Sequence, residues 1–208
     1  MPEASFFCYN IISMQKIKVI KGGVCSARGF RAAGVGAEIK YKGRNDVALI
    51  VADAPCVAAA PVLLDREVVR GGKVQAILAN SGCANACTGE EGLKDAKLSA
   101  LVTAGELGID PKHVLVASTG VIGRRLAMDR LLAGMKAAKA ALGATYEHGL
   151  AAEKAVLTTD TKPKQACAQV TIGGKTVTVG GMSKGSGMIE PNMATMLGFV
   201  TTDRKSVV

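Results

Sequence analysis

The amino-acid sequence predicts an α/β protein in which mixed β-sheets are layered with helices. Short apolar or alternating runs, typical of strands, recur between Gly-rich turns, and segments with a helical period lie among them. The apolar residues are mainly Ala, Val, Ile, Leu and Met, whereas aromatics make up 3% of the chain and Trp is absent. Together with 25 glycines, these small side chains let helices approach sheets closely, as α/β packing requires.

Five segments are predicted to be strands because of their apolar or alternating composition. In chain order they are residues 17–21, about 38–42, 46–52, 73–80 and 113–118. Gly-rich turns separate the first three of them. The fourth, KVQAILAN, is almost continuously apolar and is therefore expected to be buried.

Three helices and one hairpin complete the predicted elements. Residues 91–107 place their apolar side chains at a helical period. Residues 127–142 are rich in Ala, Leu and Lys, which favour helices, and residues 151–157 are expected to form another helix on the same side. Residues 170–181, VTIGGKTVTVGG, contain two alternating runs around Gly173-Gly174 and predict a β-hairpin.

The length and charge of the chain limit the kinds of protein it can be. Its 208 residues suit one domain, or a domain and a half, with a substantial core. The formal net charge of +9 is compatible with an anionic partner or with ordinary solubilising charge. Scattered Lys and Arg and few aromatics weigh against a nucleic-acid partner. No run approaches the ~18 apolar residues of a membrane span, so no membrane partner is expected.

The six cysteines are expected to be free thiols in a reducing cytoplasm, because no signal peptide is recognised ahead of them. Cys83 and Cys87 are spaced as CxxxC, a spacing that can hold zinc when a second pair of ligands is available. No second pair and no nearby His completes such a site. The sequence therefore predicts no metal.

Two Gly-rich stretches are the candidates for chemistry, since neither histidine lies in a catalytic motif. The first, ASTGVIG at 117–123, directly follows a predicted strand. A tight turn there can present the hydroxyl of Thr119 and the backbone N–H of Gly120 to a developing oxyanion. An ordinary junction of strand and turn explains the same residues, so both interpretations stay open.

The second stretch, GGMSKGSGMIEPNMATMLGFVTTD, spans residues 180–203. It contains Lys184 in a Gly-rich setting, followed by an apolar run that is broken at Ala194-Thr195. A lysine on such a loop suits a carboxylate ligand. A solvated lysine in a turn fits the same pattern, and the residues alone do not decide between the two.

Five motifs occur along the chain in a fixed order: GFRAAGVGAEIK, LANSGCANACTGEEGL, VLVASTGVIG, LTTDTKPK and GGMSKGSGMIEPNMATMLGFVTTD. Together they resemble the ornithine acetyltransferase (glutamate N-acetyltransferase) family of arginine biosynthesis, from about Ile17 to Asp203. The resemblance implies an αββα-like fold of the DmpA and ornithine acetyltransferase type. It also implies a cytoplasmic enzyme that transfers acetyl from N2-acetylornithine to glutamate by a ping-pong route. Acetyl-CoA is left open as a further donor, and no resident cofactor is implied.

The resemblance further implies that the precursor cleaves itself between Ala194 and Thr195. Thr195 then becomes an amino-terminal nucleophile that forms an acetyl ester. Its freed α-amine has an ordinary pKa of about 7.7–8 and can take the proton from its own hydroxyl, which explains how the site works without a catalytic His. The mature enzyme is implied to be a heterotetramer of two α and two β chains, the β-chain coming from the same precursor.

The same resemblance assigns two oxyanion-stabilising positions and three substrate-binding positions: Thr119 and Gly120, and Thr158, Lys184 and Thr195. Lys184 is expected to pair with the substrate α-carboxylate, and Thr161 is the alternative to Thr158. Asn80 and Asn85, in the second motif, are expected to serve turns rather than catalysis.

The likeness divides the chain into three parts. They are a poorly ordered extension at 1–15 with Met14 as the natural start, an α-chain domain at 16–194, and the first residues of a β-chain at 195–208. Family members continue well beyond the cleavage point and carry a further segment near residues 56–62. The alternative to an active enzyme is therefore an inactive truncated remnant that only associates with a partner chain. A self-cleaving amidohydrolase of the aminopeptidase type and a nucleic-acid binder are weaker alternatives.

Overall fold

The computed structural model describes residues 17–40, 42–56, 63–185 and 196–204, which form two four-stranded sheets and the helices around them. The central sheet has the strand order β2-β3-β4-β5, and only β4 and β5 run parallel. Its strands are β2 (Phe30–Val35), β3 (Val47–Cys56), β4 (Val74–Asn80) and β5 (Val114–Ser118). The hairpin sheet has the order β1-β6-β7-β8 and is antiparallel throughout. Its strands are β1 (Lys18–Ile20), β6 (Lys164–Ile172), β7 (Lys175–Lys184) and β8 (Leu197–Thr202).

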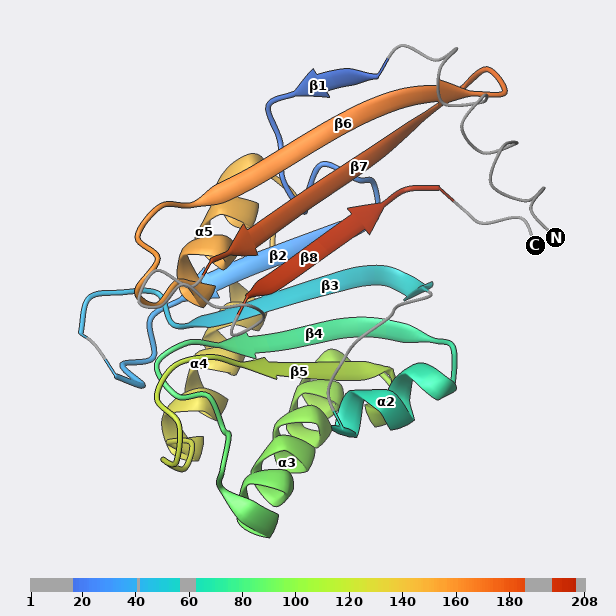
Figure 1. The fold of residues 1–208 in the computed structure, drawn as a ribbon. Coiled ribbons are helices and arrows are strands. Elements are labelled where there is room, and N and C mark those ends of the chain that lie inside the picture. The colour runs from blue at the N-terminus through green and yellow to red at the C-terminus, as the bar shows by residue number, and fades with distance from the viewer. Residues whose placement is uncertain (1–16, 41, 57–62, 186–195, 205–208) are drawn as a thin grey trace, which may run out of the picture.

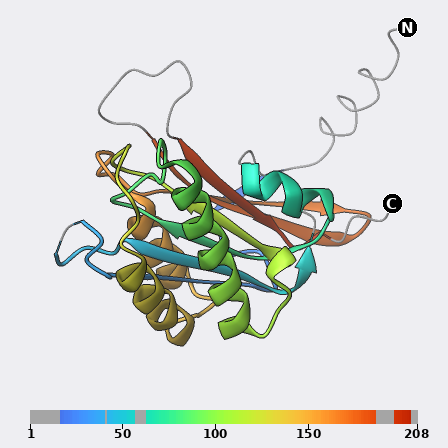
Figure 2. The same ribbon diagram turned by 90° about the horizontal axis from the view of Figure 1, so that it is seen from below.

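The two sheets lie one above the other, and helices cover the outer face of the central sheet (Figure 1, Figure 2). The covering helices are α2 (Leu63–Arg70), α3 (Gly89–Leu107) and α4 (Met128–Ala140), and a 3-10 turn at Pro111–His113 leads into β5. Helix α5 (Tyr146–Val156) packs mainly on β2 and β3 and also contacts β6 and β7. The arrangement confirms the predicted α/β class with helices layered on mixed sheets.

Small aliphatic side chains fill the space between the two sheets. The central sheet contributes mostly alanines, whereas Met182 and Phe199 supply the bulk from the hairpin sheet. The cluster consists of Val24, Ala32, Ala48, Ile50, Ala79, Ala152, Ala155, Val156, Met182 and Phe199. Gly34 allows α5 to lie directly on β2, because a Cβ atom there would be 1.9 Å from the carbonyl oxygen of Ala151. The expected aliphatic, closely packed core is therefore present.

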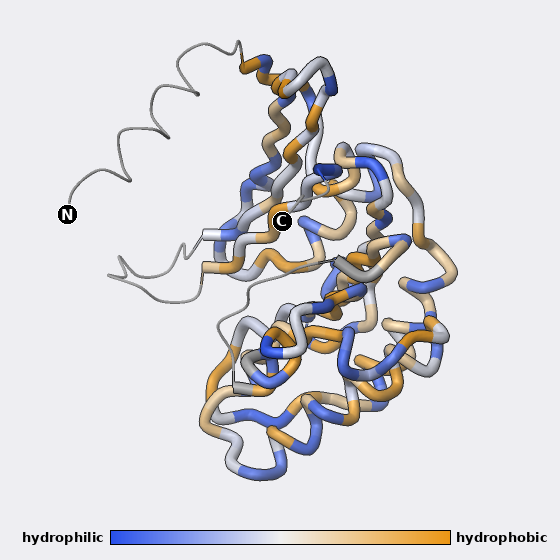
Figure 3. The backbone as a smooth tube through the Cα atoms, turned by 90° about the vertical axis from the view of Figure 1, so that its right-hand side faces the viewer, coloured by the Kyte–Doolittle hydropathy of each residue, from blue (hydrophilic) through white to orange (hydrophobic). Residues whose placement is uncertain are grey.

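Buried and exposed residues alternate along the strands of the hairpin sheet, so one face is turned to this core and the other faces outward. Figure 3 shows hydrophobic and hydrophilic residues interspersed along these strands. The outward face includes Val19, Val179 and Val200, whose exposed fractions are 79%, 39% and 74%. Cross-strand pairing places Val19, Ala168 and Val179 in one row, with Val200 beside Gly181 in the next. Exposed apolar side chains gathered on one face are typical of a surface that another chain covers.

Most predicted elements are confirmed, with boundaries shifted by a few residues. The strands expected at 17–21, 46–52, 73–80 and 113–118 correspond to β1, β3, β4 and β5. The hairpin turns at Gly173-Gly174 as expected and is longer than predicted, because β6 and β7 pair over nine residues each. The three predicted helices correspond to α3, α4 and α5, although α5 begins at Tyr146 rather than at residue 151.

The strand expected at about 38–42 is wrong. Residues 36–40 have no strand pairing, and Glu38 adopts a positive φ of 55°. The carboxylate of Asp46 explains this conformation, because it accepts hydrogen bonds from the backbone N–H groups of Ala37 and Ile39, both at 2.6 Å. The partner of β3 is instead the preceding segment β2, with Phe30 paired to Ala52. The short helix α2 and the edge strand β8 were also not predicted.

Helix α5 carries a carboxyl group that is buried without a partner. The Glu153 side chain is 0% exposed, and neither carboxylate oxygen has a hydrogen bond to any described residue. The side-chain amide of Gln165, on β6, is also buried, and neither its nitrogen nor its oxygen has a hydrogen bond to a described residue. Removal of Glu153 from water disfavours its charged form and raises its pKa to about 7, against a smaller opposing effect of Lys164.

This shift predicts how stability depends on pH. In the folded protein Glu153 keeps its proton up to a pH of about 7, whereas in the unfolded chain it releases the proton above a pKa of about 4.5. The contribution of protonated Glu153 to the free energy of unfolding is therefore full below pH 4.5 and is lost as the pH rises to about 7. Glu153→Gln removes the charge and keeps the shape. We expect the variant to be about 2 kcal/mol more stable than the parent at pH 8 and nearly equal at pH 4.5. Urea denaturation at both pH values measures this, and a pH-independent difference would contradict it.

Candidate active site

Three strand ends meet at one side of the molecule. Figure 1 shows the carboxyl ends of β5 and β7 and the beginning of β8 on the same side. Lys184, the last residue of β7, is the cross-strand partner of Leu197, the first residue of β8. Leu197 and Ala117 of β5 both pack against the core between the sheets. The two Gly-rich stretches singled out from the sequence, one after β5 and one between β7 and β8, therefore start from neighbouring positions.

Backbone hydrogen bonds lock the loop after β5 to the loop after β4. The N–H of Thr119 donates to the carbonyl of Asn80 at 3.0 Å, and the N–H of Val121 donates to the carbonyl of Gly82 at 3.3 Å. Gly120 fits between these contacts with a φ of 139°, and a Cβ atom there would lie 2.4 Å from the carbonyl carbon of Gly82. Position 120 therefore requires glycine for both its conformation and its space.

The side chain of Asn80 holds the same junction. Its amide donates to the carbonyl of Cys83 at 3.0 Å, and its oxygen accepts from the Ser118 hydroxyl at 2.7 Å. Asn85, further along this loop, has a positive φ of 48° and donates to the carbonyl of Gly92 at 2.8 Å. Both asparagines thus support turns, as expected from the sequence.

The hydroxyl of Thr119 is buried and unpartnered. The residue is 0% exposed, and its Oγ1 atom has no hydrogen-bond partner within the described part of the chain. A buried hydroxyl without a partner is unfavourable unless something else supplies the bond. Its backbone is fixed by the hydrogen bonds to Asn80 and Gly82, so the hydroxyl is held in place without a partner among the described residues.

Lys184 is the other buried polar group of this region, with 1% of its surface exposed. Its Nζ donates to the Thr158 hydroxyl at 3.1 Å, so of the two candidate threonines it is Thr158 rather than Thr161 that contacts the lysine. Among the described residues it forms no ion pair. Burial lowers the pKa of Lys184, and the negative charge of Asp160 opposes that shift.

Asp160 is a residue of this region that the sequence interpretation missed. Its Oδ2 atom accepts from the backbone N–H of Gly185 at 2.7 Å and from the ammonium of Lys164. Its side chain is 12% exposed. These contacts lower its pKa to about 2, with the hydrogen bond from Lys164 as the largest cause. The only signal in the sequence was the position of Asp160 two residues after Thr158 in the LTTDT motif.

Ala194 and Thr195, the predicted cleavage pair, lie outside the described residues, as do residues 1–15 and the end of the chain after residue 204. The described chain resumes at Met196, which is 71% exposed.

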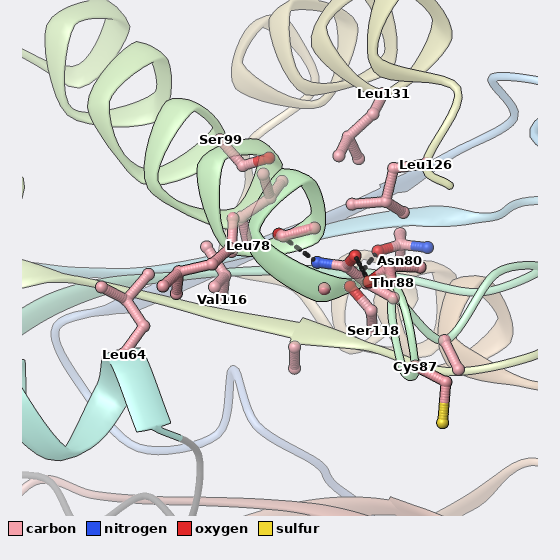
Figure 4. A pocket seen from close by; sticks show the side chains of 17 residues that line it. Leu64, Leu78, Asn80, Cys87, Thr88, Ser99, Val116, Ser118, Leu126 and Leu131 are labelled. Atoms are coloured by element: carbon pink, nitrogen blue, oxygen red, sulfur yellow. Dashed lines mark hydrogen bonds between the residues drawn. The ribbon is translucent and has the colours of Figure 1, made fainter. Parts of the chain in front are cut away.

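A cavity of about 300 Å³ lies between α3 and the central sheet (Figure 4). Leu78 and Val116 line it from the strands. At the ends of β4 and β5, Asn80 and Ser118 also line it. The cavity therefore borders the hydrogen-bonded junction of Asn80 and Ser118 that precedes Thr119.

Within the described ranges, no three His, Cys, Asp or Glu side chains gather as a bound metal ion would require. The helices of the same ranges include none that is long and apolar enough to cross a membrane.

Comparison with known proteins gives a consistent match. The ArgJ family model matches residues 31–206. The arginine biosynthesis bifunctional protein ArgJ of Symbiobacterium thermophilum is 55% identical over 196 residues, covering 88% of this chain and 48% of the relative. The Bacillus subtilis protein of the same name is 44% identical over 203 residues, covering 92% and 49%. The chain thus spans about half the length of the curated relatives it matches.

Two solved structures share the fold. The ArgJ crystal structure from Bacillus halodurans superposes with a TM-score of 0.80 at 42% identity, covering 87% of this chain and 100% of that chain. Ornithine acetyltransferase of Mycobacterium tuberculosis, solved in complex with ornithine, gives 0.77 at 38% identity, covering 86% and 100%. The solved chains are matched over their full length, unlike the curated proteins.

The unpartnered hydroxyl leads to a test of stability. Thr119→Val keeps the shape of the side chain and removes a group without a partner, so we expect stability to be unchanged or up to about 1 kcal/mol higher. The matched control is Thr103→Val, because Thr103 is equally buried but donates to the Ser99 carbonyl at 2.7 Å. The control is expected to lose about 1 kcal/mol in urea denaturation. Equal losses in the two variants would show that the Thr119 hydroxyl has a partner in the folded chain.

Proposed function

Because this chain belongs to the ArgJ family, we propose that it is the α-chain part of a glutamate N-acetyltransferase of arginine biosynthesis. The reaction moves the acetyl group of N2-acetylornithine to the amine of glutamate. The observation that supports this most directly is the buried Lys184, which lacks an ion pair within the described residues and lies at the strand end next to the 186–195 segment. The Asp160 charge acts on Lys184 without forming an ion pair, so an anion that binds the buried ammonium directly would stabilise it further. An amino-acid carboxylate supplies that anion.

The nucleophile in this proposal is Thr195, freed by cleavage of the bond between Ala194 and Thr195. The Thr195 hydroxyl attacks the acetyl carbonyl, its proton passes to the α-amine, and ornithine leaves as the amine product. The acetyl ester on Thr195 is then attacked by the amine of glutamate, which restores the hydroxyl. The proposal requires Thr195 to lie near Lys184, because the acetyl group and the substrate carboxylate must bind in one site.

Cleavage of a precursor is supported by the lengths of the relatives. The curated ArgJ proteins are covered to 48% and 49% by this chain, whereas the ArgJ chain in the Bacillus halodurans crystal structure is covered completely. A crystallised chain of about half the length of the curated proteins is what cleavage near their middle produces. The second half would be the β-chain, and two copies of each chain would form the heterotetramer.

The oxyanion of each tetrahedral intermediate would be stabilised by Thr119 and Gly120. The Thr119 hydroxyl is fixed and lacks a partner among the described residues, and the backbone at Gly120 is held by the contact with Gly82. Donors that are positioned before the reaction stabilise developing charge at little reorganisation. Thr158 contributes by orienting the Lys184 ammonium through its hydroxyl. No metal or resident cofactor has a part in this mechanism, and acetyl-CoA is an additional candidate donor.

The exposed valines of the hairpin sheet favour the second chain as the partner of this face. Val19, Val179 and Val200 would be buried if the β-chain covered the sheet. The same exposure fits the alternative function, an inactive remnant that only associates with another chain, since this chain spans about half of its relatives. The two functions differ in whether acetyl reaches Thr195.

Acetyl labelling tests the proposal directly. The chain is combined with the second half of a family member, incubated with N2-[14C]acetylornithine without glutamate, and digested for peptide mapping. We expect the label on Thr195, and its loss when glutamate is added. Thr195→Ala should abolish both labelling and cleavage, whereas Thr202→Ala, an exposed threonine on β8, should retain both. An intact, unlabelled chain in the complemented sample would support the remnant instead.

The role of the Thr119 hydroxyl predicts a change in rate. Thr119→Val in the complemented enzyme is expected to lower turnover by ~10²–10³, the usual effect of removing one oxyanion donor. Acetyl transfer to glutamate at saturating substrate measures this, and the Thr103→Val control should stay within a few-fold of the parent. If Thr119→Val turned over as fast as the parent, the Thr119 hydroxyl would have no part in the mechanism.

A further inference from the structure

The loop between α5 and β6 brings one carboxylate to the end of β7. Asp160 lies two residues after Thr158, and its Oδ2 atom accepts from the Gly185 N–H at 2.7 Å. Gly185 directly follows Lys184, so this hydrogen bond fixes the backbone at the buried lysine. The Asp160 carboxylate and the Thr158 hydroxyl thus reach the same end of β7 from a single loop.

Among the described residues, Asp160 is the charged group that acts on Lys184, and it raises the pKa of the ammonium against the effect of burial. Asp160 in turn binds Lys164, on β6, whose side chain is 48% exposed. Glu153, on α5, lies within the electrostatic reach of both Asp160 and Lys164. Water solvates the exposed ammonium of Lys164. Its positive charge therefore needs the Asp160 carboxylate far less than the charge of the buried Lys184 does.

We propose that Asp160 is a positioning residue of the site: it fixes the Lys184–Gly185 backbone and keeps the buried Lys184 charged and ready for the substrate α-carboxylate. The substrate contact in this statement rests on the proposed function, whereas the effect of Asp160 on Lys184 is a property of the chain itself. Asp160 does not touch the reacting atoms in this role. Its effect belongs to substrate binding rather than to the rate of acetyl transfer.

The first test follows Lys184 directly and needs no acetyl transfer. The 208-residue protein is labelled with [6-13C]lysine, and Lys184→Arg identifies the Lys184 signal by its loss. Asp160→Asn removes the negative charge and keeps the shape, so the titration midpoint of Lys184 should move to lower pH. Lys164→Met removes the competing cation and should leave the midpoint unchanged or slightly higher. An unchanged midpoint in Asp160→Asn would overturn the proposal.

The second test measures kinetics in the complemented enzyme. Asp160→Asn is expected to raise KM for N2-acetylornithine at alkaline pH, where Lys184 loses its proton, and to leave kcat within about two-fold. The rise in KM with pH should begin at lower pH than in the parent, because Lys184 loses its proton earlier. If the ion pair with Lys164 merely supported the loop, Lys164→Met would reproduce the KM defect, and the proposal would be wrong.

A third variant keeps the test decisive if Asp160→Asn does not fold. A Cβ atom on Gly185 would lie 2.9 Å from Asp160 Oδ2, so Gly185→Ala displaces the carboxylate without removing it. The Lys184 midpoint and KM should shift in the same direction as for Asp160→Asn, by a smaller amount. No shift in either quantity would overturn the proposal. A parent enzyme that transfers no acetyl would refute the proposed function alone, since the lysine titration would still report on Asp160.

Discussion

The packing of the two sheets through small side chains is the constraint on which the rest of the structure depends. Alanines at positions 32, 48 and 79 let the central sheet lie close to Met182 and Phe199 of the hairpin sheet. The ends of β5 and β7 are thereby brought to one side of the molecule, where β8 begins (Figure 1). Neither sheet alone could form the site, because Thr119 follows the central sheet and Lys184 ends a strand of the hairpin sheet.

Backbone contacts then convert this proximity into defined geometry. The loops after β4 and β5 bind each other through Asn80, Thr119 and the close contact of Gly120 with Gly82. The end of β7 is held separately, by the Asp160 carboxylate on Gly185 and by the Thr158 hydroxyl on Lys184. Both anchors consist of hydrogen bonds within the chain, and both leave a polar group without its full set of partners among the described residues. Such preorganisation is what a site for a charged, reacting substrate needs.

Buried polar groups without a full set of partners occur at more than one place in the fold. The Thr119 hydroxyl has no partner and Lys184 has no ion pair among the described residues, and the family resemblance points to the same two positions. Glu153 lies on α5, and Gln165, on β6, is the cross-strand partner of Met182 on β7. Burial of Glu153 raises its pKa to about 7, so its effect is on the stability of the fold and its pH dependence. Burial without a partner therefore does not by itself identify a site.

Local patterns in the sequence determined the α/β class, the aliphatic core, the Gly173-Gly174 hairpin and most helices and strands, because periodicity and turn residues act over short distances. The motifs likewise determined the family and named Thr119, Thr158 and Lys184. Only the tertiary structure decided that residues 36–40 leave the sheet, since that depends on the Asp46 carboxylate rather than on local propensity. It also decided that Thr158 rather than Thr161 meets Lys184, and that Asp160 reaches Gly185. These contacts join residues about 25 positions apart, and packing rather than any local pattern selects them.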